Sequence, residues 1–343
     1  MAPRKPTKKK HWGAAVTLLA VLPLMFGAAG AGYWLATTPY GPEHETFVEV
    51  APGSSTARIG QQLEAAGVVR SRYAFEAMRW WKRGAPRAGE YRFDHPAPVT
   101  EIYTRMVRGD VFTKTVTIPE GSNIFEIAAR LEQAGYGGEG FLDAAVKQAG
   151  LIADLDPGAT SLEGYLFPDT YHFARKATPE QIAAAMVRRF RTEAGQLGLK
   201  ENVHTVVTLA SLVERETAVD AERPLVASVF TNRLAKKMPL MTDPGVIYGL
   251  ELEGRWRGTI YQSDLKRDTP YNTYLHAGLP PGPVGNPGMR SLRAAMEPAQ
   301  TDYLYFVAAG ANAQGVSRFS STIEEHNRNV AGYRQAVKQA GGR

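Results

Sequence analysis

The chain has 343 residues, 44% of them apolar, so it can bury a large core and is long enough for two or three folded units. It has no cysteine, which excludes disulfides, thiol catalysis and Cys-ligated metal sites. The formal charge of +6 is concentrated at the N-terminus. Without the five basic residues that precede Glu43, 40 − 5 = 35 Lys and Arg face 34 Asp and Glu, so a nucleic-acid partner is disfavoured.

The first segment is apolar and follows a basic run. No residue from Trp12 to Ala36 is charged, and about 20 apolar residues suffice for a helix to cross the hydrocarbon layer. We therefore expect a transmembrane helix over 12–36 and, by the positive-inside rule, a cytoplasmic tail over 1–11. This predicts a single-pass inner-membrane protein whose remaining chain is extracytoplasmic. A signal peptide cleaved near residues 29–31 is the alternative, and it also predicts export.

Two segments, 48–67 and 116–135, resemble each other at an offset of 68 residues. Each predicts a strand, a Gly-Ser turn in which the Ser can cap a helix, an amphipathic helix, and a terminating Gly. Between them, 89–93 is typical of a strand and 99–107 of a helix. The pattern predicts two small sheet-and-helix units.

A Gly- and Pro-rich passage, 156–171, marks the next boundary. Beyond it the sequence predicts an α+β unit made mainly of helices. Its expected elements are helices over 179–197, 202–217 and 221–236, a loop region over 239–287, a helix from about 291, a strand over 303–308 and a terminal helix.

The helix predicted over 202–217 carries a carboxylate beside its apolar stripe. At about 100° per residue, Glu216 lies about 60° from Val213, whereas Arg215 points toward solvent. Burial raises the pKa of a carboxyl group, which suits a general acid. The alternative interpretation is structural, with Glu216 capping the next element or pairing with an arginine such as Arg223.

Several motifs now appear in a fixed order. They are LEGYLFPDTY (162–171), ASLVERETAVDAERPLVASVFTNRL (210–234), TDPGVIYGL (242–250), YNTY (271–274), GLPPGP (278–283), NPG (286–288), YLYFVA (303–308) and HNRNV (326–330). Together they resemble the endolytic murein transglycosylases, the MltG or YceG-like family, over most of the chain after the apolar segment.

The resemblance implies a lyase that cleaves between N-acetylmuramic acid and N-acetylglucosamine of nascent peptidoglycan and leaves a 1,6-anhydro end. The family's catalytic glutamate maps onto Glu216, which would act as acid and then as base. The implied fold is a mainly helical, lysozyme-like catalytic domain with a small sheet, preceded by LysM-like units that either bind sugar or act as spacers. The expected organisation is a tail (1–11), an anchor (12–36), two LysM-like units (45–112 and 113–156) and a catalytic domain (157–343).

Six further residues are candidates for substrate binding. Aromatic faces pack on sugar rings and amides bond acetamido groups, although loop packing or turn capping would explain the same residues. The candidates are Tyr248, Tyr271, Asn272, Tyr274, Glu163 and Asp169.

No cofactor or metal is expected. The seven histidines lack metal-ligand spacing, and GYGGEG (135–140) follows a predicted helix where a dinucleotide fingerprint follows a strand. The expected partners are glycan strands, the membrane and, from the resemblance, penicillin-binding proteins or other peptidoglycan synthases. Two alternatives are a non-catalytic wall-binding scaffold and a hydrolytic muramidase with a second carboxylate.

Overall fold

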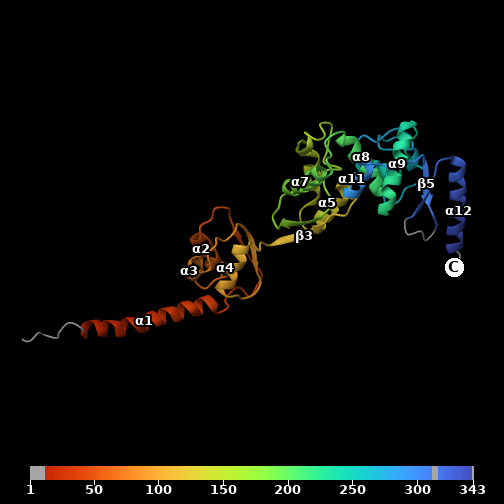
Figure 1. Ribbon diagram of the computed structural model, residues 1–343. Coiled ribbons are helices and arrows are strands. Elements are labelled where there is room, and N and C mark those ends of the chain that lie inside the picture. The colour runs from red at the N-terminus through yellow and green to blue at the C-terminus, as the bar shows by residue number, and fades with distance from the viewer. Residues whose placement is uncertain (1–11, 311–315, 342–343) are drawn as a thin grey trace, which may run out of the picture. The chain divides into compact units, whose positions relative to one another are not determined.

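The computed structural model describes residues 12–310 and 316–341, with side chains from residue 21 to residue 339. The chain divides into two compact units, 1–114 and 115–343 (Figure 1). The described part contains twelve α-helices and three two-stranded sheets. The predicted α+β class is confirmed.

The first helix, α1 (Trp12–Thr37), covers the residues over which a membrane span was predicted. Crossing the hydrocarbon layer takes about 20 predominantly apolar residues. In the part of the chain that the structure describes, no helix is both long enough and apolar enough to cross a membrane. The predicted transmembrane helix over 12–36 and the single-pass localisation are therefore wrong, and the predicted tail over 1–11 lies outside the described residues.

The first unit packs three helices and a two-stranded sheet around one core. Its elements after α1 are β1 (Thr46–Val50), α2 (Thr56–Ala65), α3 (Arg72–Lys82), β2 (Gly89–Phe93) and α4 (Val99–Arg108). β1 and β2 pair in antiparallel fashion, with Val48 opposite Tyr91. Tyr91 is fully buried, and its hydroxyl donates to the carbonyl oxygens of Arg87 and Met106. Tyr103 is also fully buried and donates to the carbonyl oxygen of Gly84, so both phenols of this apolar core have hydrogen-bond partners.

The second unit is larger and mainly helical. Its elements are β3 (Thr113–Thr117), α5 (Ile124–Gln133), α6 (Gly138–Lys147), η1 (Ala149–Ile152), β4 (Thr170–Ala174), α7 (Pro179–Leu197), α8 (Val203–Glu216), η2 (Asp220–Glu222), α9 (Arg223–Ala235), α10 (Asp243–Leu252), η3 (Asp264–Lys266), α11 (Met289–Met296), β5 (Tyr305–Ala308), β6 (Ser317–Ser320) and α12 (Ile323–Gly341). β3 pairs with β4, and β5 pairs with β6 in antiparallel fashion.

Both repeats form the strand, turn and helix that their sequences predict, but the cap lies one residue later than expected. Ser55 accepts a hydrogen bond from the amide of Arg58 at the start of α2. Asn123 forms a capping box with Glu126 at the start of α5. The Ser of each Gly-Ser pair, including Ser122, therefore precedes the capping residue, because the turn takes one residue more.

One hydrophobic core runs through the whole second unit. It extends from Val116 on β3 to Ala295 on α11 and includes the strand and helices predicted for a second LysM-like unit. The expected boundary near residue 156 falls within this shared core. The division into units over 45–112 and 113–156 and a catalytic domain over 157–343, and their LysM-like character, stay predictions.

Helix α8 lies at the centre of this core. Residues 207–213 are all buried, and α8 packs against α9, α10 and α11 (Figure 1). Over these seven residues the helix has no solvent face, although Thr205 in its first turn is exposed. The expected stripe with Arg215 opposite it therefore does not describe α8, and the environment of each charged residue at its end depends on the neighbouring elements.

The region predicted as loop over 239–287 contains a helix, α10. Thr242 precedes its first residue, Asp243, and Pro244 lies in the first turn, where a missing amide hydrogen costs nothing. Met241, just before, has a φ of 54°, an uncommon conformation for a residue with a side chain. The strained turn directs Thr242 and Asp243 toward the end of α8.

Candidate active site

Three consecutive charged residues end helix α8, and each has a different environment. The helix stops at Glu216 because Thr217 adopts an extended conformation, with φ −140° and ψ 134°. Helices α9, α10 and α11 and the loop before α5 contact this end of α8. The partners of each side chain therefore show which charge is free for chemistry.

Glu214 belongs to a buried ion pair. One carboxylate oxygen lies 2.6 Å from Nη1 of Arg223, and the other accepts a hydrogen bond from the amide of Gly288 at 3.0 Å. The side chains of Glu214 and Arg223 are 4% and 6% exposed, respectively. This pair joins α8, α9 and the start of α11, so it is a structural element of the core.

Arg215 is also held by protein groups. Its guanidinium donates to the carbonyl oxygen of Gly121 at 2.9 Å and contacts the carboxylate of Glu126 at 3.3 and 3.4 Å. Its side chain is 18% exposed. The prediction that Arg215 points to solvent is wrong, because the loop before α5 packs over this side of the helix.

Glu216 lines a cavity of about 640 Å³. In the described part of the chain its carboxyl group makes no hydrogen bond or ion pair, and the side chain is only partly exposed. The cavity walls come from α8, α9, α10, α12, β5 and the loop before α10. They are formed by Arg215, Glu216, Phe230, Arg233, Leu240, Met241, Thr242, Asp243, Pro244, Ile247, Tyr274, Tyr305, Phe306, Ile323 and His326.

The pKa of Glu216 is raised to about 7. Burial is the main cause, the nearby carboxylate of Asp243 adds to it, and the guanidinium of Arg233 opposes it. The sequence-based expectation of a raised pKa is confirmed. Near neutral pH this carboxyl group can both donate and accept a proton.

Asp243 is the second carboxylate in the cavity. The hydroxyl of Tyr274 donates a hydrogen bond of 2.7 Å to one of its oxygens. Burial and the hydrogen bond to Asp243 raise the pKa of Tyr274, so the phenol stays protonated as the donor. The pair connects α10 to the loop that follows η3.

Arg233 is a second cation of the cavity beside Arg215, and no carboxylate of the described residues is bound to it. Its Nε donates to the carbonyl oxygen of Leu304 at 2.7 Å, and Nη1 donates to that of Leu240 at 2.8 Å. The guanidinium lies 5.3 Å from the centre of the Tyr305 ring. Burial lowers the pKa of Arg233. Backbone carbonyls and an aromatic face therefore hold a positive charge beside Glu216 without neutralising it.

His326 on α12 closes another part of the wall. Its ring stacks on Tyr305 at 5.0 Å, and burial together with the charge of Arg233 lowers its pKa. Nδ1 is buried and lacks a hydrogen-bond partner among the described residues. The imidazole therefore presents an unsatisfied polar atom in a wall that contains Glu216.

Of the three substrate-binding candidates in the YNTY motif, one lies in the cavity and two lie outside it. Tyr274 lines the cavity, whereas Tyr271 packs on Tyr248 at 4.9 Å. Asn272 is 1% exposed; its amide donates to two loop carbonyls, and its oxygen accepts from the amide of Tyr274. Tyr248 is 3% exposed and also packs on Phe125. Asn272 therefore stabilises the loop that carries Tyr274.

The two acidic candidates of the LEGYLFPDTY motif lie outside the cavity. Glu163 is 2% exposed and accepts hydrogen bonds from the amide of Ile124 and the side chain of Asn286, both at 2.9 Å. Burial raises its pKa to about 8. Asp169 accepts a bond from the amide of Thr170 and pairs with Arg189 at 2.6 Å. Glu163 joins three buried segments, and Asp169 belongs to a surface turn.

The sequence analysis did not identify Arg233, Tyr305 or Thr242 as site residues. Arg233 and Tyr305 stand in quoted motifs, and nothing in helical phase separates them from core or surface residues. The one usable signal concerns Arg233: an arginine in the last turn of a helix rarely enters a core unless a charge or an aromatic ring contacts it. The distance between Arg233 and Tyr305 in sequence hides their contact.

Comparison with known proteins agrees with the motifs. The YceG-like family model matches residues 48–332. An endolytic murein transglycosylase of Bacillus subtilis strain 168 is 35% identical over 303 residues, which cover 82% of each chain. One of Streptococcus pneumoniae strain D39 is 31% identical over 321 residues, with 83% of this chain and 57% of the relative covered.

A solved structure agrees as well. The crystal structure of a YceG-like protein from Listeria monocytogenes superimposes with a TM-score of 0.54 at 33% identity. The match covers 84% of this chain and 99% of the other. Family model, relatives and structure cover the same large part of the sequence, and the chain belongs to the YceG-like family.

Proposed function

We propose that this protein is an endolytic murein transglycosylase with Glu216 as its acid and base. It would cleave the bond between N-acetylmuramic acid and N-acetylglucosamine of peptidoglycan without water and leave 1,6-anhydro ends. One observation carries the proposal: a carboxyl group with a pKa of about 7 and no protein partner in the described chain lines a cavity large enough for sugar rings. The relatives' names support the substrate class.

The proposed reaction uses one proton twice. Protonated Glu216 donates its proton to the glycosidic oxygen as the bond from that oxygen to C1 of N-acetylmuramic acid breaks. The resulting carboxylate of Glu216 then removes the proton from the C6 hydroxyl of the same sugar. The C6 oxygen bonds to C1 at the same time. Glu216 ends protonated and ready for another cycle, so no further proton donor is needed.

The other charges of the cavity would tune this group. Asp243 favours the protonated form of Glu216, and Arg233 favours the ionised form. Their opposing effects keep the pKa near neutrality, where both half-reactions are accessible. Tyr274 holds Asp243 through its hydroxyl and also offers an aromatic face to a sugar ring.

Hydrolysis is the second candidate, because Asp243 places another carboxylate in the cavity. A muramidase uses a second carboxylate to activate water or to bond the sugar. The hydrogen bond from Tyr274 occupies one oxygen of Asp243. The other oxygen accepts no hydrogen bond from the residues that the structure describes, which is the condition that a hydrolytic role requires.

Digestion of purified, uncross-linked glycan strands separates these possibilities. The lyase predicts products with anhydro ends, which are lighter by one water than the products of hydrolysis. Mass spectrometry measures this difference, with the Glu216→Gln chain as the blank. Reducing ends would replace the lyase with a muramidase, and uncut strands would favour a binding scaffold. A partnership with peptidoglycan synthases stays a prediction.

A further inference from the structure

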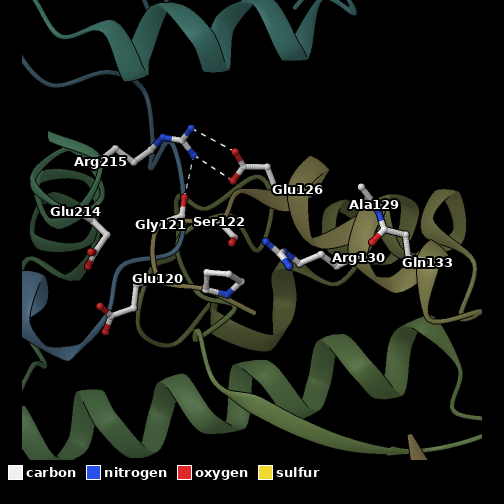
Figure 2. Close-up of a pocket in the computed structure, with 10 residues that line it drawn as sticks. Glu120, Gly121, Ser122, Glu126, Ala129, Arg130, Gln133, Glu214 and Arg215 are labelled. Atoms are coloured by element: carbon white, nitrogen blue, oxygen red, sulfur yellow. Dashed lines mark hydrogen bonds and ion pairs between the residues drawn. The ribbon is translucent and has the colours of Figure 1, made fainter. Parts of the chain in front are cut away.

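A second cavity lies beside the end of α8. Its volume is also about 640 Å³, and Arg215 lines both cavities (Figure 2). Its walls are the loop before α5, one face of α5 and the last turn of α8. They are formed by Pro119, Glu120, Gly121, Ser122, Glu126, Ala129, Arg130, Gln133, Glu214 and Arg215.

The carboxylates of this second cavity are engaged or near a cation. Glu214 bonds Arg223 and the amide of Gly288, and Glu126 contacts Arg215. Glu120 lies 3.8 Å from Arg223, and burial followed by the charge of Glu214 raises its pKa. The first two carboxylates therefore have little capacity left for a ligand.

Two donors of the second cavity, Arg130 and Ser122, have no acceptor within the described chain. The side chain of Arg130 points from α5 toward the loop of residues 119–122 (Figure 2), and it has no hydrogen bond or ion pair in the described chain. Ser122 is 4% exposed as a residue, and its hydroxyl makes no hydrogen bond within the described chain but keeps contact with the solvent of the cavity. Arg130 is exposed, so its guanidinium is accessible to a ligand. A carboxylate could accept hydrogen bonds from both groups.

We propose that the second cavity binds a free carboxylate on the stem peptide of the glycan strand whose sugars occupy the Glu216 cavity. This inference rests on the proposed function. The carboxylates of murein lie mainly on its peptides, while its acetylated sugar rings are uncharged. Arg130 would bind the carboxylate through its planar fork, Ser122 would donate a third hydrogen bond, and Arg215 would mark the passage between sugar and peptide.

Binding of a defined ligand tests the inference. The full chain carrying Glu216→Gln is titrated with a peptide-bearing murein tetrasaccharide and with the same compound after amidation of every carboxylate. We expect amidation to weaken binding by about tenfold, the value of one charge-assisted contact. Adding Arg130→Gln should remove that difference, and adding Ser122→Ala should weaken binding of the free carboxylate about threefold.

Two matched variants define the controls. Arg188 is an exposed arginine on α7 outside both cavities, so Arg188→Gln should leave the tenfold difference intact. Glu120→Gln removes a negative charge and should leave binding of the carboxylate ligand equal or tighter. A larger loss with Glu120→Gln than with Arg130→Gln would mean that the cavity takes a cation, and the proposal would be overturned.

Kinetics distinguish this inference from the proposed function. In the active chain, Arg130→Gln should raise KM for peptide-bearing strands about tenfold at unchanged kcat and leave amidated strands unaffected. Equal binding of free and amidated ligands would reject the peptide site even if strands are still cut. Full activity of Glu216→Gln would instead reject the catalytic assignment and say nothing against the carboxylate contact.

Discussion

The two cavities at the end of α8 have the same volume and opposite free charges. In the first, Glu216 lacks a partner within the described chain while carbonyl oxygens and Tyr305 hold the cation Arg233. In the second, Arg223 and Gly288 hold the carboxylate of Glu214, and the cation Arg130 has no partner there. A charged side chain is available to bind or react with a ligand where the neighbouring charged groups have protein partners and it has none.

The largest expected effect is on activity, from Glu216→Gln. Loss of a general acid and base should lower kcat by about 10²- to 10⁴-fold. The matched control is Glu201→Gln, since Glu201 is exposed and makes no ion pair in the described chain. Initial rates on glycan strands provide the measurement. If the Glu216→Gln chain stayed fully active, Glu216 would not be the catalytic residue and would not differ in role from the structural Glu214.

The same variant tests the buried carboxyl group through stability. A raised folded-state pKa means that Glu216 binds its proton more tightly in the folded protein, and the stability from this is lost as pH rises through about 7. The free energy of unfolding of the parent should therefore fall relative to Glu216→Gln between pH 5 and pH 8. Urea titrations at several pH values measure this. A constant difference would show that burial does not perturb the group.

Glu214→Gln should reduce stability more than chemistry. Removing one partner of a buried ion pair costs about 3 to 5 kcal/mol, because the charge of Arg223 loses its closest counter-ion. Chemical unfolding measures the loss, and rates are compared at a temperature where both proteins are folded. If stability were unchanged while activity disappeared, Glu214 and Glu216 would have exchanged roles.

Asp243→Asn should shift the pH profile. Asp243 raises the pKa of Glu216, so its neutralisation should lower that pKa and move the alkaline limb of kcat/KM to lower pH by about one unit. The pH dependence of strand cleavage provides the readout. A shift to higher pH would contradict the electrostatic role. Complete inactivity with normal folding would favour the hydrolytic mechanism, in which Asp243 takes part directly.

Tyr274→Phe should have the smallest effect. It removes the hydroxyl that bonds Asp243 and keeps the aromatic ring. We expect a two- to tenfold decrease in kcat/KM, which is about the effect of losing one hydrogen bond. Tyr261→Phe is a suitable control, since Tyr261 is exposed and lies outside the cavity. A loss as large as that of Glu216→Gln would make Tyr274 a participant in the proton transfers.

Local patterns predicted most of the elements correctly. The helix at 179–197 matches α7, because Thr178 and Gln181 form a capping box and Gly198 ends it in a left-handed conformation. The strand at 89–93 matches β2. These features depend on neighbours within a few residues, which the sequence displays directly.

Features that depend on distant segments were predicted less well. The stripe analysis assumed a solvent face on α8, but residues 207–213 are enclosed on every side. Helix α10 was taken as loop because its sequence contains Pro and Gly, yet Pro244 occupies the first turn, where it is tolerated. An apolar segment at 12–36 suggested an anchor, but no helix among the described residues is long and apolar enough to span a membrane.

By itself the sequence determined the α+β class, most of the helices, the family and the choice of Glu216 as the candidate acid, since motifs and caps are local. Only the tertiary structure decided which charges remain free. Glu214 and Glu216 are two residues apart, and their different environments come from Arg223, Gly288, Arg233 and Asp243. Those partners lie 9 to 74 residues away from them along the chain, and the field that sets a pKa depends on distance in space.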